Sequence, residues 1–96
     1  RYCKAYINDR FRLNHWGKVK IVYELKKRGL DKEYIDAAID DIDDDEYTEV
    51  LRKLIDDKLR TIKDTDVYSA KVKTLGYALR RGFESDIVSK ILKDVF

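Results

Sequence analysis

The chain has 96 residues, of which 44% are hydrophobic and 42% charged, so it can bury one modest core beneath a heavily charged surface. It contains no proline and four glycines, which favours long helices over a loop-rich or all-β fold. Its only cysteine, Cys3, excludes an internal disulfide and a cysteine metal site, and no apolar run reaches the roughly 18–20 residues that span a membrane.

The net charge of +2 conceals a strong segregation of charge along the chain. Residues 1–30 hold nine basic and two acidic side chains, residues 31–57 hold three and twelve, and residues 58–96 hold nine and five. We therefore expect separate basic and acidic faces, each able to select partners. The lone cysteine fits a reducing cytoplasm, and the start at Arg1 rather than methionine suggests a fragment of a longer protein.

The first 42 residues predict three helices. Apolar residues at helical spacing indicate one helix over residues 1–13 and, after a break at 14–17, a second over residues 17–28. The second ends in a basic turn followed by Gly29, a residue type suited to the left-handed position after a helix. Asp31 is expected to cap the third helix. The apolar stripe of this third helix consists of Ile35, Ala38, Ile39 and Ile42.

The three aspartates at positions 43–45 follow, and we expect them to form an acidic linker because adjacent carboxylates repel one another and aspartate has poor helix propensity. A fourth helix is predicted over residues 46–63. A fifth is predicted over residues 66–81, capped by Asp64 or Thr65 and burying three apolar residues. These are Val72, Leu75 and Leu79. Ser85 is expected to cap the sixth helix.

The second half of the chain repeats the first at an offset of 53 residues. Lys18-Val19-Lys20 recurs as Lys71-Val72-Lys73, and Arg28-Gly29-Leu30 recurs as Arg81-Gly82-Phe83. A period of about 50 residues indicates a copied and stacked supersecondary unit. We therefore predict an all-α fold of two tandem three-helix repeats, helix-turn-helix-like and elongated, over residues 1–42 and 46–96.

The order and spacing of several motifs in both copies carry a family resemblance. In the first copy they are Tyr6-Ile7, Gly17, Ile21, Glu24-Leu25 and Arg28-Gly29-Leu30, followed by an acidic helix from Asp31 to Ile39. In the second they are Tyr77, Arg80-Arg81-Gly82-Phe83 and Ile87 to Leu92. Together they resemble the RecX regulatory protein family over essentially the whole chain. The resemblance implies the second and third of three tandem three-helix repeats.

The same resemblance implies a function. RecX-like proteins are non-enzymatic regulators that bind the filament of the RecA recombinase on single-stranded DNA and inhibit its growth, ATP hydrolysis and strand exchange. The expected partner is that filament, with DNA contacted directly or only through the recombinase. We expect a cytoplasmic monomer with no membrane partner and no cofactor.

Nine basic residues are candidates for contact with phosphates or with an acidic protein groove. They are Lys18, Lys20, Lys26, Lys27, Arg28, Lys71, Lys73, Arg80 and Arg81. Those next to the two glycines also complement the helix dipole, so a purely structural interpretation stays open for them. The dipole disfavours cations near a helix start, so the other four are the stronger candidates. These are Lys18, Lys20, Lys71 and Lys73.

Trp16, in the first break, is a candidate for stacking on a base, although a tryptophan there also closes the top of a small core. His15 has no second metal ligand at usable spacing and no nucleophile placed beside it, so we predict neither a metal site nor catalysis. The alternative function is a stand-alone nucleic-acid-binding module whose third helix enters the major groove. A purely structural scaffold within a larger protein also stays open.

Overall fold

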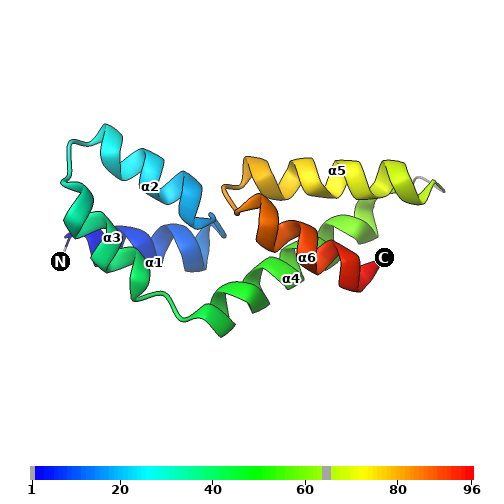
Figure 1. The fold of residues 1–96 in the computed structure, drawn as a ribbon, viewed down its shortest axis with the longest axis horizontal. Helices are drawn as coiled ribbons and strands as arrows, with labels where there is room; N and C mark the ends of the chain where they lie inside the picture. Colours follow the sequence, from blue (N-terminus) through cyan, green and yellow to red (C-terminus); the bar gives the residue numbers. More distant parts are fainter. Residues whose placement is uncertain (1, 64–65) are drawn as a thin grey trace.

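The computed structural model describes residues 2–63 and 66–96, and its described elements are all helical (Figure 1). They are α1 (Tyr2–Asn8), the π-helix η1 (Asp9–Leu13), α2 (Lys18–Lys27), α3 (Lys32–Asp40), α4 (Asp44–Thr61), α5 (Val67–Arg80) and α6 (Ser85–Val95). The predicted all-α fold is therefore confirmed. In the described part of the chain, no helix is both long and apolar enough to cross a membrane.

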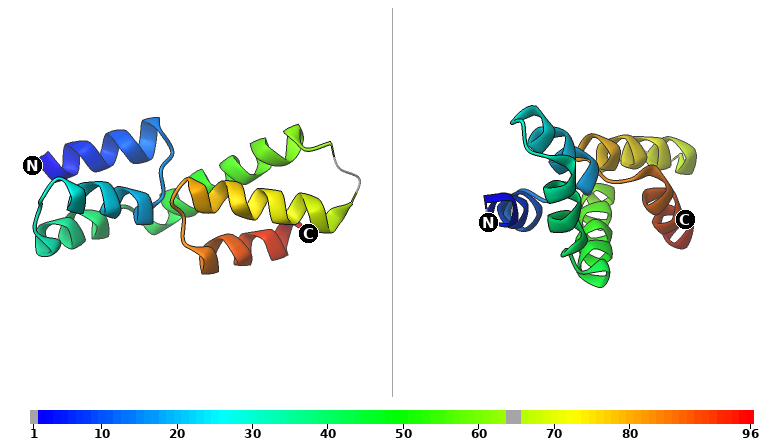
Figure 2. Two further views of the ribbon diagram at one scale, coloured as in Figure 1. Left: turned by 90° about the horizontal axis from the view of Figure 1, so that it is seen from above. Right: turned by 60° about the vertical axis from the view of Figure 1, so that its left-hand side comes forward.

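The helices form two three-helix units that lie end to end (Figures 1 and 2). The first unit comprises α1 with η1, α2 and α3, and the second comprises α4, α5 and α6. The molecule measures 46 × 24 × 21 Å, which confirms the elongated arrangement. The division into separate domains over residues 1–42 and 46–96 stays a prediction. The two units share one hydrophobic core, so packing alone does not separate them.

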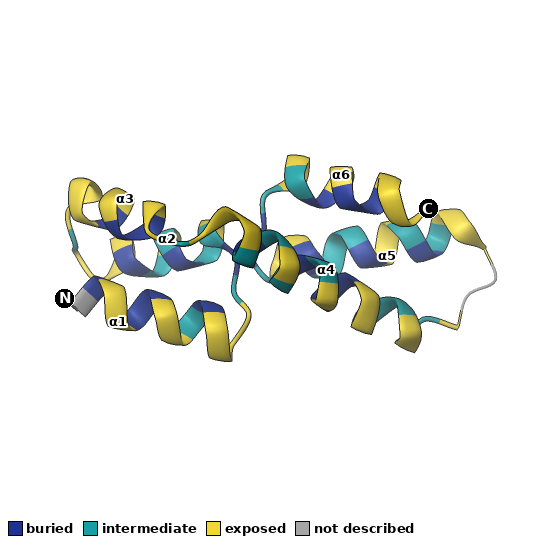
Figure 3. Ribbon diagram, turned by 90° about the horizontal axis from the view of Figure 1, so that it is seen from below, coloured by how far each residue is buried: buried dark blue, intermediate teal, exposed yellow. Residues whose placement is uncertain are grey.

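Three aromatic rings join the cores of the two units. Phe11 of η1, Tyr47 of α4 and Phe83 of the α5–α6 turn are each at most 2% exposed. The ring centre of Tyr47 lies 5.6 Å from that of Phe11 and 5.2 Å from that of Phe83. Buried and exposed segments alternate along the helices of both units (Figure 3). One hydrophobic cluster therefore runs through the whole molecule.

The beginning of α2 is capped by the second unit. Gly17 N–H donates to the Arg81 carbonyl oxygen at 2.7 Å, and Val19 N–H donates to the Gly82 carbonyl oxygen at 2.9 Å. Lys18 N–H donates to the Tyr47 hydroxyl at 2.8 Å. The first N–H groups of a helix have no partner within the helix, so these three bonds satisfy donors that would otherwise be orphaned.

Two glycines allow this close approach. A Cβ on Gly17 would lie 2.3 Å from the backbone carbon of Gly82, and a Cβ on Gly82 would lie 2.3 Å from the Cβ of Lys20. Gly82 also has φ +96, a left-handed conformation that side chains disfavour. Gly29, its counterpart in the first unit, has φ +81, but a Cβ there would meet nothing within 4 Å. Of the two glycine turns, the α5–α6 turn of the second unit is the one against which the start of α2 packs.

The boundary between the acidic linker and α4 differs from the sequence-based expectation. The acidic linker predicted at residues 43–45 is wrong in its extent, because Asp44 and Asp45 lie in the first turn of α4. Asp43 is the N-cap, and its side chain accepts from Glu46 N–H at 2.9 Å. Carboxylates are favourable at this end of a helix dipole, and that preference decides the boundary.

The predicted caps of the last two helices are also corrected. The N-cap of α6 is Glu84 rather than Ser85. The N-cap of α5 is Asp66, whose side chain accepts from Tyr68 N–H at 3.2 Å. Asp64 and Thr65 lie outside the described residues.

The buried face of α5 also differs from the prediction. Val72 is 49% and Leu79 is 40% exposed, and Leu75 is only partly buried. The buried stripe consists of the small residues Ala70, Thr74 and Ala78. α5 packs against both α4 and α6, and small side chains let the helix axes come close. Thr74 tolerates burial because its hydroxyl donates to the Ala70 carbonyl oxygen at 2.8 Å.

Replacing Gly17 by alanine tests the junction. Gly17 has φ −79 and ψ 169, which alanine adopts freely, so the collision with Gly82 is the main effect. We expect Gly17→Ala to lower the free energy of unfolding by about 2–3 kcal/mol in urea titrations followed by circular dichroism. The matched control is Gly76→Ala inside α5, which we expect to stabilise by about 0.5–1 kcal/mol. Its added Cβ meets only the end of the Arg80 side chain. Similar effects at both glycines would contradict the packing argument.

The Tyr47 hydroxyl makes a second prediction. It accepts from Lys18 N–H and donates to the Glu84 carboxylate at 2.5 Å. Tyr47→Phe leaves both groups without this partner, so we expect a loss of about 1–3 kcal/mol at neutral pH.

Burial, together with the bond to Glu84, raises the pKa of Tyr47 well above its ordinary value of 10. Below pH 10 the phenol is neutral in both states, and its contribution to stability is complete. Above pH 10 it ionises in the unfolded chain only, so stability falls by up to about 1.4 kcal/mol per pH unit. Urea titrations at about pH 9 and pH 11 should show the difference between wild type and Tyr47→Phe shrinking as pH rises. A constant difference would refute the assignment.

Candidate functional site

The structure gives Lys18 partners inside the molecule. Its side chain is 21% exposed, and its ammonium nitrogen lies 4.6 Å from the ring centre of Tyr47 and 3.9 Å from a carboxylate oxygen of Asp44. These contacts supply a structural reason for a cation at the start of α2, where the helix dipole disfavours it. Lys18 is therefore a weaker candidate for a ligand contact than its neighbour Lys20.

Lys20 and Trp16 meet at the junction of the two units. The Lys20 ammonium lies 4.4 Å from the Trp16 ring centre, and the Arg10 guanidinium lies 5.3 Å from the same ring. Trp16 is partly buried and packs against the hydrophobic cluster. The ring therefore closes the core and also holds two cations. Stacking of a base on Trp16 stays a prediction.

Arg10 is absent from the residues that sequence patterns single out, yet it is central to this region. Its guanidinium lies 5.0 Å from the Tyr6 ring, and that of Arg28 lies 4.8 Å from the same ring. Tyr6, Arg10 and Asn14 follow at steps of four, which is the available signal in the sequence. That spacing gains meaning only once the fold places Trp16 beside them.

A second group of cations joins the first through Asn14. Arg81 donates from Nη2 to the main-chain oxygen of Asn14, and Arg10 donates from Nη1 to its side-chain oxygen at 3.3 Å. Arg81 and Lys58 lie 5.8 Å and 4.8 Å from the Tyr77 ring. We call the whole series the cation–ring row. Its members are Arg28, Tyr6, Arg10, Trp16, Lys20, Arg81, Tyr77 and Lys58.

Among the described residues, four cations of the cation–ring row form no ion pair with a carboxylate. They are Arg10, Lys20, Lys58 and Arg81. Seven other cations each lie within 4 Å of a carboxylate oxygen: Lys4, Arg12, Lys18, Lys27, Lys32, Arg52 and Arg60. Rings and carbonyl oxygens orient a cation but do not cancel its charge. The row is therefore a positive surface that spans both units.

The structure brings only part of the predicted set together. Lys20, Arg28, Arg81 and Trp16 belong to the row. Lys26 and Arg80 are exposed at helix ends, and Lys27 pairs with Glu24 at 3.7 Å. Lys71 lines a separate crevice between α5 and α6, and Lys73 is exposed on α5. The repeated sequence motif thus has different surroundings in its two copies.

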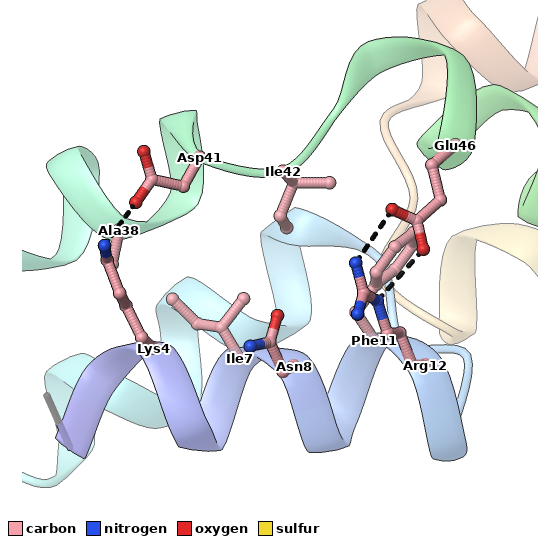
Figure 4. A pocket seen from close by; sticks show the side chains of 9 residues that line it. All are labelled: Lys4, Ile7, Asn8, Phe11, Arg12, Ala38, Asp41, Ile42 and Glu46. Carbon is pink, nitrogen blue, oxygen red and sulfur yellow. Dashed lines mark hydrogen bonds and ion pairs between the residues drawn. The ribbon is translucent and has the colours of Figure 1, made fainter.

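A crevice of about 340 Å³ lies between α1 and the α3–α4 connection (Figure 4). Its floor is apolar, with Ile7 and Phe11 among its lining residues. Two ion pairs cross it, Lys4–Asp41 at 3.0 Å and Arg12–Glu46 at 3.0 Å. These pairs neutralise its charges, and they tie α1 to the end of α3 and η1 to the first turn of α4. The crevice therefore lacks the free charge found in the cation–ring row.

Two family models match the chain: RecX, second three-helix domain, over residues 1–39, and RecX, third three-helix domain, over residues 44–92. The chain is 33% identical to regulatory protein RecX of Clostridium acetobutylicum, covering 100% of this chain and 46% of that protein. It is 30% identical to that of Clostridium beijerinckii, covering 98% and 44%. It is 32% identical to that of Legionella pneumophila, covering 99% and 61%. The chain spans less than half the length of the two clostridial relatives. No solved structure matches it.

Proposed function

This chain belongs to the RecX family, as the two matched domains and the relatives show, and on that premise we propose that it regulates the RecA recombinase. It binds the RecA filament on single-stranded DNA and inhibits filament growth, ATP hydrolysis and strand exchange. It does so in the bacterial cytoplasm, without catalysis of its own, as part of DNA recombination and repair.

The observation that carries this proposal is the unneutralised charge of the cation–ring row. A filament on DNA presents phosphates and acidic protein surface, and both attract fixed cations. The row crosses from the first unit to the second, so binding would use both units at once. Filament growth would then be inhibited because the chain occupies surface that the next recombinase subunit needs. Strand exchange would be inhibited because it occupies surface that the second DNA strand needs.

A major-groove reader is the less favoured alternative. In a helix-turn-helix the second helix of the pair enters the groove, and here that element is α3 or α6. The exposed face of α3 carries Glu33, Asp36 and Asp40, which phosphates would repel. α6 offers Lys90 and Lys93, but acidic residues flank them at Asp86 and Asp94. Neither helix presents a uniformly basic face.

Co-sedimentation with RecA filaments on single-stranded DNA, beside bare DNA at two salt concentrations, tests the proposal. We expect Lys20→Glu to weaken filament binding on the order of tenfold, because it reverses one unneutralised charge of the row. The matched control is Lys32→Glu, an exposed cation already paired with Asp36 at 2.9 Å. We expect little effect of the control. Lys18→Glu requires a parallel measurement of stability, because it places another carboxylate beside Asp44.

Filament binding well above bare DNA would support the regulator. Equal binding to both, with a steep loss at high salt, would instead indicate a general phosphate-binding module. Equal losses for Lys20→Glu and Lys32→Glu would remove the cation–ring row from the proposal.

A further inference from the structure

Two guanidinium groups from different units meet on one asparagine. Arg10 of η1 donates to the side-chain oxygen of Asn14, and Arg81 at the end of α5 donates to its main-chain oxygen. Neither pairs with a carboxylate among the described residues. Two like charges that share one asparagine as hydrogen-bond partner repel each other, and an anion bound by both would relieve the repulsion.

Each guanidinium also has unused hydrogen-bonding capacity. A guanidinium carries five N–H donors, and the structure shows one bond to a protein acceptor from each group. The Nε atoms of both Arg10 and Arg81 are buried and have no acceptor. Buried donors without acceptors are unfavourable and uncommon. The Nε atoms are covered, so an arriving oxygen would meet the Nη groups first.

Aromatic rings fix both groups in advance. The Arg10 guanidinium lies 5.0 Å from the ring of Tyr6 and 5.3 Å from that of Trp16, and the Arg81 guanidinium lies 5.8 Å from the ring of Tyr77. Side chains that are already ordered lose less entropy on binding. The pair is therefore prepared for a ligand rather than merely exposed to solvent.

We propose that Arg10 and Arg81 form one binding site for a phosphodiester group of single-stranded nucleic acid. This deepens the proposed function, on which it rests for its biological setting. A phosphodiester has two free oxygens, which suit bonds from two planar guanidiniums. Lys20 shares the Trp16 ring with Arg10, and Lys58 shares the Tyr77 ring with Arg81, so further free charge lies near each arginine, which fits a chain of phosphates better than one carboxylate. The rings of Trp16 and Tyr77 are only partly buried, and unpaired bases stack on such aromatic side chains in single-strand-binding proteins.

The test uses fluorescence anisotropy of a labelled oligothymidylate without recombinase. We expect Arg10→Gln and Arg81→Gln each to weaken binding on the order of tenfold. The slope of log K against log salt should become shallower by about 0.7 for each phosphate that the variant no longer binds. The matched control is Arg12→Gln, two residues from Arg10 and already paired with Glu46. Circular dichroism of each variant shows that the fold is intact.

A second readout reports on the site itself. In ¹⁵N NMR spectra, the Nε–Hε resonances of Arg10 and Arg81 should shift when oligothymidylate is added. An uncharged methylphosphonate oligothymidylate keeps the bases and should leave both resonances in place.

Three results would overturn the proposal: losses no larger than that of Arg12→Gln, resonances that do not move, or equal binding of the methylphosphonate. If both variants lose filament binding but keep oligothymidylate binding, the site takes an acidic group of the recombinase. The phosphodiester site then fails while the proposed function stands. If oligothymidylate binding behaves as expected but filaments are not bound, the site stands and the proposed function fails.

Discussion

The architecture depends on how the first N–H groups of α2 find acceptors. Gly17 and Val19 donate to carbonyl oxygens of the α5–α6 turn, and Lys18 donates to the Tyr47 hydroxyl. A helix start in the interior must satisfy such donors, and here the acceptors belong to the other unit. This requirement sets the distance between the units and demands glycine at position 17. It also brings the Trp16 region beside Arg81.

Cations near this junction differ in their partners from several cations on other parts of the surface. Away from it, cations such as Lys4, Arg12 and Arg52 are neutralised by carboxylates of neighbouring helices. At the junction Lys18 pairs with Asp44, whereas Arg10, Lys20 and Arg81 contact aromatic rings or the oxygens of Asn14 instead. These contacts orient the three cations but do not neutralise them, so they contribute free positive charge where the two units meet.

Much of this was predictable from local patterns. Helical spacing, the left-handed glycines and the repeat identified the two three-helix units, because each signal is contained within one turn or one helix. The buried face of α5 was not, since apolar volume pointed to Val72 and Leu79 while close helix packing selected Ala70, Thr74 and Ala78. Arg10 was not predictable for a similar reason, because its importance comes from residues that only the folded chain brings to it.

Gly82 and Gly29 occupy equivalent positions in the two copies, yet Gly17 has no glycine counterpart. The residue at its offset in the second copy is Ala70, which lies inside α5 and is buried. A chain built from two copies of the second half would thus carry a methyl group at the junction, where the backbone of Gly82 would have to shift to accommodate it. The two halves are therefore not interchangeable, and recombination between them at the gene level would yield a less stable junction.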